Sequence, residues 1–222
     1  MNLAERLEQG LYELDCSVQF QSQELQQRMI QYLLLIEKWN KRYNLTAVKS
    51  IEAMLYQHVM DSLSITTYIK GPKIVDIGTG AGLPGIPLAI TQPDWQVILV
   101  ESNQKKTAFL QQVKIELGLA NVIIVPKRVE DFFFKNKINT VISRAYSSLG
   151  LFLNTTQHLV PSNDVCCRWV AMKSRCSDRE LADVTPPFFI ENKIPLTVPG
   201  LLVSRELIII GQSVQLSELD RE

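Results

Sequence analysis

A glycine-rich stretch, VDIGTGAGLPGIPLAI at residues 75–90, holds the residues with the clearest potential for chemistry. It places an acid, Asp76, before glycines at every second position, Gly78, Gly80 and Gly82, and it follows an apolar run typical of a buried strand. Glycines at such a turn permit positive φ angles and let a ligand lie close to the backbone. We therefore expect a nucleotide-like cofactor here, because such ligands lie beyond the carboxyl ends of strands in doubly wound sheets.

Two cofactors compete for this turn. GAGLPG, at residues 80–85, satisfies the dinucleotide fingerprint and keeps a nicotinamide or flavin enzyme open as an alternative. In a dinucleotide site the first glycine of the fingerprint follows the strand directly. Here Gly78 is the first glycine after the strand, and the fingerprint begins only at Gly80. An acid followed by alternate glycines resembles motif I of S-adenosylmethionine-dependent methyltransferases, whose acid addresses the amino-acid end of the cofactor through the loop or water. Asp76 would repel a pyrophosphate and attract an ammonium or a sulfonium.

Three positions further along fit a nucleoside cofactor. WQVILVESN places Glu101 about 20 residues after the glycines, where an acid binds ribose hydroxyls in both dinucleotide and methyltransferase folds. NVIIVPKRVEDF places Val129 and Glu130 just past the next strand, where the methyltransferase plan holds the adenine. Asp131 is a competing acceptor, and either acid could instead cap a short helix.

The spacing of apolar residues predicts the elements that position these groups. Residues 24–46 and 50–69 repeat apolar side chains every three or four positions, so we expect helices there. From residue 73 onward, short apolar runs alternate with helical segments, which predicts a doubly wound α/β sheet. Four prolines between residues 185 and 200 favour a late edge strand. We expect a helical extension over residues 1–70 and a catalytic domain over residues 71–222.

Composition narrows the class of protein. The 222 residues are 46% hydrophobic and carry 23 basic and 23 acidic side chains, so net charge indicates no pull toward nucleic acid or membrane. No stretch approaches the roughly 18 apolar residues of a membrane span, and we expect a cytoplasmic protein. Four irregularly placed cysteines (Cys16, Cys166, Cys167 and Cys176) predict neither a disulfide framework nor a metal site. We interpret His58 and Asp61 as capping and loop-bracing residues rather than metal ligands.

Taken together, five segments resemble one known family. EKWNKRYNLTAV, HVMDSL, VDIGTGAGLPGIPLAI, KRVEDF and VISRAYSSL occur in the order and spacing of the bacterial 16S ribosomal RNA guanine-N7 methyltransferase G family, also called glucose-inhibited division protein B. The resemblance covers residues 25 to about 175. It implies a Rossmann-like Class I sheet of seven strands, the last antiparallel, with an N-terminal helical extension. It also implies S-adenosyl-L-methionine as cofactor and the 16S RNA of the 30S subunit as substrate.

The resemblance assigns further site residues. The family's cofactor positions fall on Gly78, Leu83, Val129, Glu130 and Arg144. Arg144, after the fourth strand, would lie at the chemistry, where its planar fork can bind a guanine edge or a phosphate. Lys173 ends the next strand and is our second candidate for catalysis or RNA contact.

Attack by guanine N7 requires positioning and no general base, because N7 already has an available lone pair. Methylation of an exocyclic amine is usually accompanied by Asn or Asp, Pro, Pro and an aromatic residue at the end of the fourth strand, whereas this chain has SRAY there. Cys166 and Cys167 could suggest thiolate attack on a pyrimidine, but they precede an apolar strand and favour packing.

Two alternatives to an RNA methyltransferase remain. One is an NAD-dependent oxidoreductase that uses GAGLPG. The other is a non-catalytic cofactor-binding ribosome assembly factor on the same fold. We expect a monomer without metal.

Overall fold

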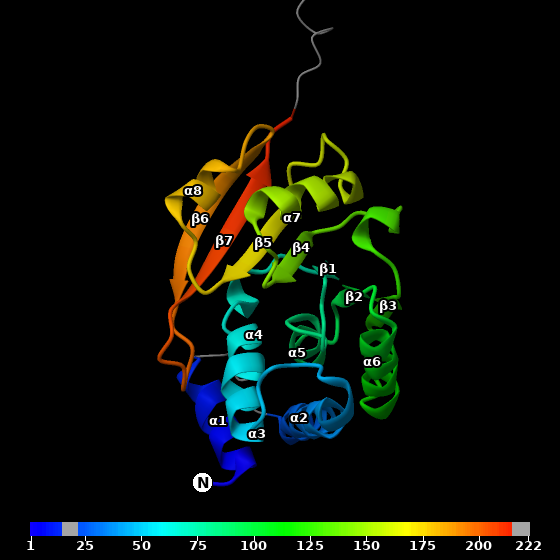
Figure 1. Ribbon diagram of the computed structural model, residues 1–222, viewed down its shortest axis with the longest axis vertical. Helices are drawn as coiled ribbons and strands as arrows, with labels where there is room; N and C mark the ends of the chain where they lie inside the picture. Colours follow the sequence, from blue (N-terminus) through cyan, green and yellow to red (C-terminus); the bar gives the residue numbers. More distant parts are fainter. Residues whose placement is uncertain (15–21, 215–222) are drawn as a thin grey trace, which may run out of the picture.

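A seven-stranded sheet forms the centre of the protein in the computed structural model, which describes residues 1–14 and 22–214 (Figure 1). The strand order is β3-β2-β1-β4-β5-β7-β6; β7 runs antiparallel to both of its neighbours and the remaining pairings are parallel. The expected fold class, with its antiparallel last strand, is thereby confirmed. The strands are β1 (Lys73–Ile77), β2 (Gln96–Val100), β3 (Val122–Val125), β4 (Thr140–Arg144), β5 (Arg168–Lys173), β6 (Phe188–Leu196) and β7 (Arg205–Gln212).

Helices precede the sheet and connect its strands. They are α1 (Leu3–Glu13), α2 (Gln23–Tyr43), α3 (Ile51–Met54), η2 (Leu55–Met60), α4 (Asp61–Leu63), η3 (Thr66–Tyr68), α5 (Gly85–Thr91), α6 (Gln104–Glu116), η4 (Val129–Asp131), α7 (Leu149–Thr156), η5 (Gln157–Leu159) and α8 (Asp178–Ala182). The late edge strand expected from the prolines is β6, which ends the sheet.

The strand order reverses between β1 and β4, and this reversal sets the site. The chain runs outward from β1 to β3 with α5 and α6 on one face, and then returns to β4, which α7 follows on the other face (Figure 1). The carboxyl ends of β1 and β4 therefore diverge at a switch point, where ligands of doubly wound folds bind.

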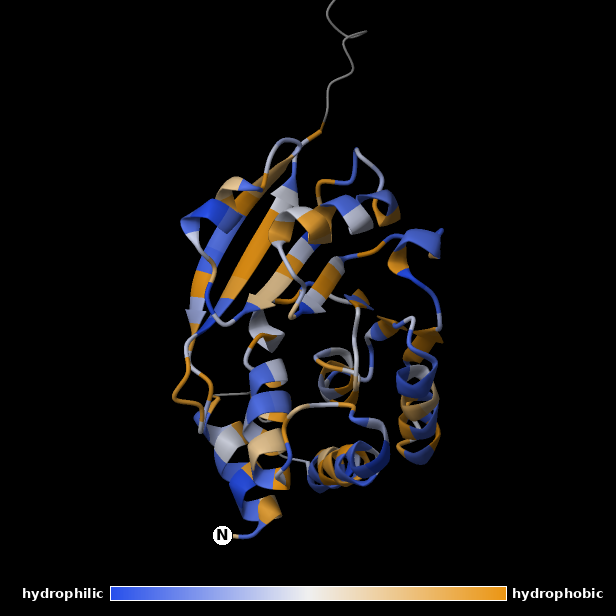
Figure 2. Cartoon of the chain, viewed as in Figure 1, coloured by the Kyte–Doolittle hydropathy of each residue, from blue (hydrophilic) through white to orange (hydrophobic). Residues whose placement is uncertain are grey.

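Two apolar cores cover the two faces of the sheet. One is shared by the N-terminal helices, α5, α6 and alternate strand residues such as Ile74 and Leu99. The other joins α7 to the opposite strand residues, including Val75 and the fully buried Trp169. Apolar residues accordingly line the strands and one side of α2 (Figure 2). The N-terminal helices thus contribute to the same core as the sheet.

Helix α2 follows from its sequence. Ser22 caps its start by accepting the Leu25 N–H, and Asn44 ends it in the left-handed conformation. Tyr32 lies on its buried face, and the Tyr32 hydroxyl donates a 2.7 Å hydrogen bond to the Ala81 carbonyl in the glycine loop. An element 49 residues away therefore holds the loop in place.

The second expected helix differs in one detail. Residues 51–63 form a continuous helix, but its middle, Leu55–Met60, is π-helical rather than α-helical. Such segments occur often at functional sites because they alter the direction of nearby side chains. Here the π-helical segment carries His58.

Some expectations lie outside the described residues or stay untested. Cys16 and residues 215–222 of the tail are not described. Cys166, Cys167 and Cys176 are free thiols. Among the described residues, no helix is long and apolar enough to cross a membrane, and no cluster of three or more His, Cys, Asp or Glu forms a metal-binding group.

Replacing Tyr32 with Phe tests the bond between α2 and the loop. We expect Tyr32→Phe to lower the free energy of unfolding by about 1–2 kcal/mol, because the buried Ala81 carbonyl loses its donor. Urea unfolding measures the change. Tyr12→Phe, at a side chain 78% exposed, is the control and should change little. Equal values for the two variants would mean that the Ala81 carbonyl finds another donor.

Candidate active site

The carboxylate of Asp76 organises the glycine loop from beneath. Asp76 lies on β1 and is fully buried. Its Oδ2 accepts hydrogen bonds from Thr79 Oγ1 at 2.6 Å and from the Gly85 N–H at 2.8 Å. The carboxylate therefore joins the end of β1, the loop and the start of α5. Any effect of Asp76 on a cofactor would pass through this loop, which is one of the two routes, loop or water, expected from the sequence.

Burial changes the ionisation of Asp76. Desolvation raises the pKa of Asp76 to about 6, although the hydrogen bonds from Thr79 and Gly85 favour the charged form and oppose the rise. Its second oxygen, Oδ1, is buried without a hydrogen-bond partner among the described residues. The carboxylate thus organises the loop at a cost in folding free energy.

Two of the loop glycines face open space. Gly78 and Gly80 have φ angles of +63° and +62°, a region that favours glycine. A Cβ added at Gly78 would meet no heavy atom of the described structure within 4 Å, and one at Gly80 would meet only the Gly78 carbonyl and the Lys106 amine at 3.9 and 4.0 Å. Internal packing therefore does not require a small residue at Gly78, and the space beside it is free for a ligand. We refer to this open surface beside Gly78 as the glycine ledge.

Glu101 closes the other side of this space. It follows β2, and its two oxygens accept the Gly80 N–H at 3.0 Å and the Asn103 N–H at 2.8 Å. The Lys106 amine lies 4.0 Å from the same carboxylate. Each carboxylate oxygen can accept further hydrogen bonds, so Glu101 can still bind ribose hydroxyls.

A cleft of about 170 Å³ brings together four of the eight expected cofactor residues, whereas Arg144 lines a second cleft. Gly78, Glu101, Val129 and Glu130 all line it. Asp76, Gly80 and Leu83 do not, because Asp76 and Leu83 are buried behind the loop and Gly80 is held against Glu101. The Leu83 N–H donates to the Thr79 carbonyl, so a direct backbone contact from Leu83 stays a prediction.

The start of α5 distinguishes between the two candidate cofactors. A dinucleotide pyrophosphate binds free N–H groups at this helix terminus. Here the Gly85 N–H is bonded to Asp76, the Ile86 N–H is bonded to the Gly82 carbonyl, and Pro87 has no N–H. These three residues offer no donor to a phosphate, and the Asp76 carboxylate would repel one.

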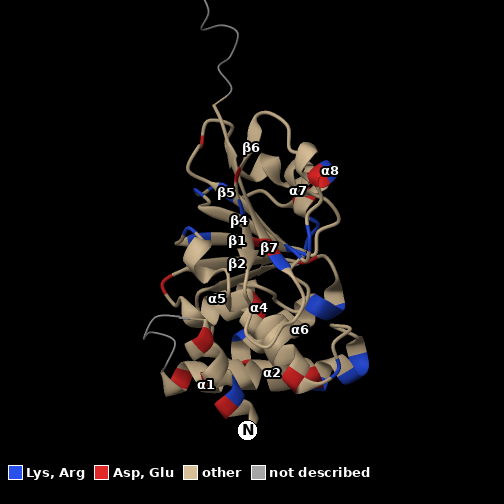
Figure 3. Ribbon diagram, turned by 90° about the vertical axis from the view of Figure 1, so that its left-hand side faces the viewer, with Lys and Arg blue, Asp and Glu red and all other residues tan. Residues whose placement is uncertain are grey.

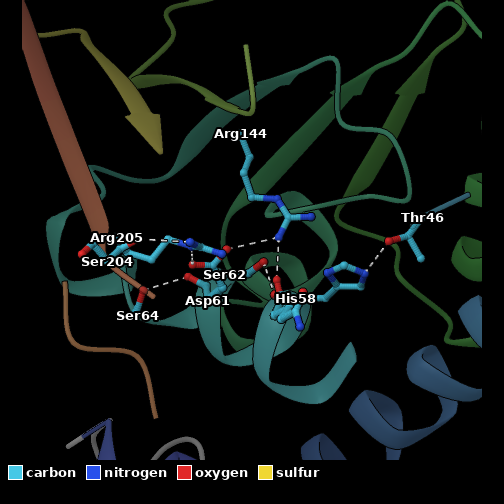
Figure 4. A network of polar contacts seen from close by, with 9 residues as sticks. Thr46, His58, Asp61, Ser62, Ser64, Arg144, Ser204 and Arg205 are labelled. Carbon is cyan, nitrogen blue, oxygen red and sulfur yellow. Dashed lines mark hydrogen bonds and ion pairs between the residues drawn. The ribbon is translucent and has the colours of Figure 1, made fainter. Parts of the chain in front are cut away.

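A second cleft, of about 460 Å³, adjoins the first and shares Tyr146 with it. Arg144 reaches into it from the end of β4, and Arg144 Nη1 donates to the Gln57 carbonyl at 3.0 Å and to Asp61 Oδ2 at 3.3 Å. Asp61 is almost fully buried, and its other oxygen accepts from Arg205 Nε at 2.9 Å (Figure 4). The structure therefore corrects our interpretation of Asp61 as a loop-bracing residue, because its carboxylate bridges two arginines.

Lys173 is less available than the sequence indicated. Its amine pairs with Glu180 Oε1 at 2.6 Å and donates to the Tyr146 carbonyl at 2.8 Å. Lys173 lines the second cleft and holds the loop after β4 against α8. This arrangement gives it a positioning role, and a direct part in methyl transfer stays a prediction.

Sequence reasoning missed three participants: Asp61 as an ion-pair partner, Arg205 and Tyr32. Asp61 and Arg205 are 144 residues apart, so no local spacing could have paired them. The only sequence signal at Asp61 was its place in HVMDSL, one of the segments that resemble the family. Tyr32 occupies a position in an apolar helical repeat that looks purely structural.

The sheet topology is that of the Rossmann-like methyltransferase fold. The glycine ledge at Gly78 and the Glu101 carboxylate lie where proteins of this fold bind a nucleoside cofactor. Among solved structures, the magnesium protoporphyrin IX methyltransferase from Synechocystis with bound S-adenosylmethionine has this fold, with a TM-score of 0.55 and 15% identity over 82% of this chain and 97% of that chain. At this identity the similarity shows the fold alone.

The family described as rRNA small subunit methyltransferase G matches residues 25–208, and the chain belongs to this family. Ribosomal RNA small subunit methyltransferase G from Nitrosomonas eutropha is 47% identical over 95% of this chain and 98% of its own length. The protein of the same name from Nitrosospira multiformis is 46% identical over 97% of this chain and 100% of its own length.

Gly78→Ala tests the open ledge, and Gly118→Ala is its matched control. Gly118 has a φ of +61° and equally open space at its Cβ, but lies after α6. We expect both variants to lose similar stability, about 1 kcal/mol, from backbone strain. Only Gly78→Ala should weaken S-adenosylhomocysteine binding, by about tenfold or more, because its methyl group enters ligand space. Calorimetric titration measures this affinity. Equal affinities for the two variants would contradict the prediction that the ligand occupies the space beside Gly78.

Asp76→Asn tests the buried carboxylate through pH. Because the folded pKa of Asp76 is raised to about 6, its contribution to stability is fully present below the unfolded pKa near 4 and is lost as pH rises through 6. We expect the wild type to lose up to about 3 kcal/mol relative to Asp76→Asn between pH 4 and pH 7. Urea unfolding across this range gives the difference, and a difference independent of pH would show that Asp76 titrates normally.

Proposed function

We propose that this protein methylates the N7 of a guanine in 16S ribosomal RNA of the small ribosomal subunit, with S-adenosyl-L-methionine as methyl donor. The observation that carries this proposal is the open ledge at Gly78, beside an α5 start whose donors are already bonded, in a chain of the rRNA small subunit methyltransferase G family. The same observation disfavours the NAD-dependent alternative.

The residues of the first cleft fit the cofactor. Gly78 leaves room for it, Glu101 offers acceptors for the ribose hydroxyls, and Val129 and Glu130 lie where the adenine would be held. When bound, S-adenosylmethionine supplies an electrophilic methyl group on a sulfonium. Asp76 and Tyr32 keep the loop in the shape that admits it.

The second cleft fits an N7 nucleophile because its titratable groups do not provide a free base. Of its lining residues, Asp61 is paired with two arginines and Glu180 with Lys173. Burial and the nearby Arg144 lower the pKa of His58 to about 4, so its neutral imidazole is a weak base at pH 7. The N7 lone pair needs no deprotonation, whereas an exocyclic amine must lose a proton during transfer.

A thiolate mechanism is disfavoured on similar grounds. Cys167 is fully buried, and desolvation raises its pKa to about 12. Such a thiol is protonated at neutral pH and faces the core. Cys167 therefore has a packing role, whereas Cys166 is exposed and lines neither cleft.

Arg144 is proposed to bind the substrate or the cofactor with the part of its guanidinium beyond Nη1. Lys127 and Arg128 line the first cleft, and Arg175 and Arg205 line the second, so cationic groups surround both openings. Elsewhere acids and bases alternate, as on the N-terminal helices (Figure 3). We propose that RNA phosphates contact the groups around these clefts.

Further parts of the proposal concern organisation. Residues 1–70 act as an extension of the catalytic domain, residues 71–222, because their helices share its core. We also propose a cytoplasmic monomer that needs no metal, in keeping with a ribosomal substrate.

The proposal is tested with labelled S-adenosylmethionine and 30S particles from a strain that lacks this modification. We expect label in 16S RNA that maps to N7-methylguanine, and tight binding of S-adenosylhomocysteine but not NADH in calorimetric titration. Cofactor binding without RNA labelling would favour the assembly-factor alternative. Binding of NADH without S-adenosylhomocysteine would contradict the proposal altogether.

A further inference from the structure

His58 has a nitrogen that the structure leaves without a partner. The residue is 4% exposed and lines the second cleft beside Arg144. Its Nε2 lies 2.9 Å from Thr46 Oγ1 (Figure 4), whereas its Nδ1 is buried with no hydrogen-bond partner among the described residues. The adjacent Gln57 carbonyl does not meet Nδ1 in hydrogen-bond geometry, and it already accepts from Arg144 Nη1 at 3.0 Å.

The contact between Thr46 and His58 is compatible with a proton on Nδ1. Thr46 Oγ1 accepts the Val48 N–H at 3.2 Å, and the acceptor within reach of its own hydrogen is His58 Nε2. In the tautomer in which the Thr46 hydroxyl donates to Nε2, the ring proton of neutral His58 lies on Nδ1. In this tautomer His58 presents an unsatisfied N–H donor at the wall of the cleft, and such a group is costly to bury.

We propose that the Nδ1–H of His58 donates a hydrogen bond to O6 of the target guanine, which makes His58 a specificity-determining residue of the methyltransferase. The inference rests on the proposed function and adds a recognition contact to it. Guanine presents O6 as an acceptor on the same edge as N7, whereas adenine presents an amino donor at that place. A neutral donor beside the cationic Arg144 would accept guanine and reject adenine.

The Nδ1 atom has almost no exposed surface, so cleft side chains must adjust around an entering base. Arg144 can make this adjustment because its side chain is 21% exposed, and rotamer changes of this kind are common on binding. A base that carries O6 would then replace the missing partner of Nδ1. A site built to bond a substrate oxygen discriminates against analogues that lack it.

The contact is expected to act on binding more than on the chemical step. Methylation places positive charge on the purine and makes O6 a weaker acceptor, so the bond contributes at least as much to the ground state as to the transition state. Its loss should therefore raise KM for the RNA substrate and leave kcat little changed.

Two substitutions separate the two nitrogens of His58. His58→Asn keeps an amide donor close to the position of Nδ1 and loses the Thr46 contact, whereas His58→Gln reaches Thr46 and loses the donor at Nδ1. We expect His58→Gln to raise KM for 30S particles about tenfold, with kcat and S-adenosylhomocysteine affinity little changed. His58→Asn should keep a KM near that of the wild type but unfold at a lower urea concentration.

A substrate analogue tests the O6 atom itself. With 2-aminopurine, which lacks O6, ligated into the position that the wild type methylates, we expect the wild type to lose about tenfold in kcat/KM relative to guanine. His58→Gln should lose little more from this change, because its donor is already absent. This convergence would support the contact even if His58→Asn folds poorly.

Several results would overturn the inference. One is a KM for His58→Gln equal to that of the wild type; another is the same loss of kcat/KM from 2-aminopurine in the wild type and in His58→Gln. Weaker S-adenosylhomocysteine binding by His58→Gln would place the acceptor on the cofactor instead. An active wild type with any of these results would leave the proposed function intact, whereas a wild type that labels no RNA would remove both proposals.

Discussion

The hydrogen bonds of the buried Asp76 carboxylate are the interaction on which the site depends. One oxygen joins the end of β1 to Thr79 and to the first amide of α5. Gly85 must lack a side chain for this to occur, because a Cβ there would lie 2.8 Å from Asp76 Oδ2 and would also overlap Leu99. The same bond removes a helix donor that a phosphate would need, so one contact both shapes the ledge and disfavours the competing cofactor.

The two clefts depend on segments that are distant along the chain. Tyr32 of α2 holds the glycine loop through Ala81, and Asp61 of α4 holds Arg144 and Arg205 at the neighbouring cleft. The N-terminal helices therefore position both halves of the site. A buried carboxylate between two arginines is costly to remove, because either arginine would then lose its neutralising partner.

Much of this arrangement could be predicted from the sequence. Apolar periodicity and the glycine loop predicted the sheet and its order of elements, because local spacing reports directly on helices and strands. Glu101 was found because one helix and one strand separate it from the glycines, which places an acid about 20 residues further along the chain. The role of Lys173 was only partly foreseen, since its pairing with Glu180 depends on how α8 packs. The bridge from Asp61 to Arg205 depends on tertiary contact alone.

The residues that sequence reasoning placed at the cofactor also fall into two groups in space. Gly78 and Glu101 face the cleft, whereas Asp76 and Leu83 support the loop from behind. A linear motif cannot separate these roles, because adjacent residues of a tight turn point in opposite directions. The backbone amides that are already hydrogen-bonded distinguish the residues that support the loop from the residues that can contact a cofactor.

A crystal structure with S-adenosylhomocysteine bound would test the central claim most directly. We predict density for the ligand over Gly78 and beside Glu101, with the Asp76 bonds to Thr79 and Gly85 unchanged. Density elsewhere, or an Asp76 carboxylate that leaves Gly85 to contact the ligand, would contradict the account.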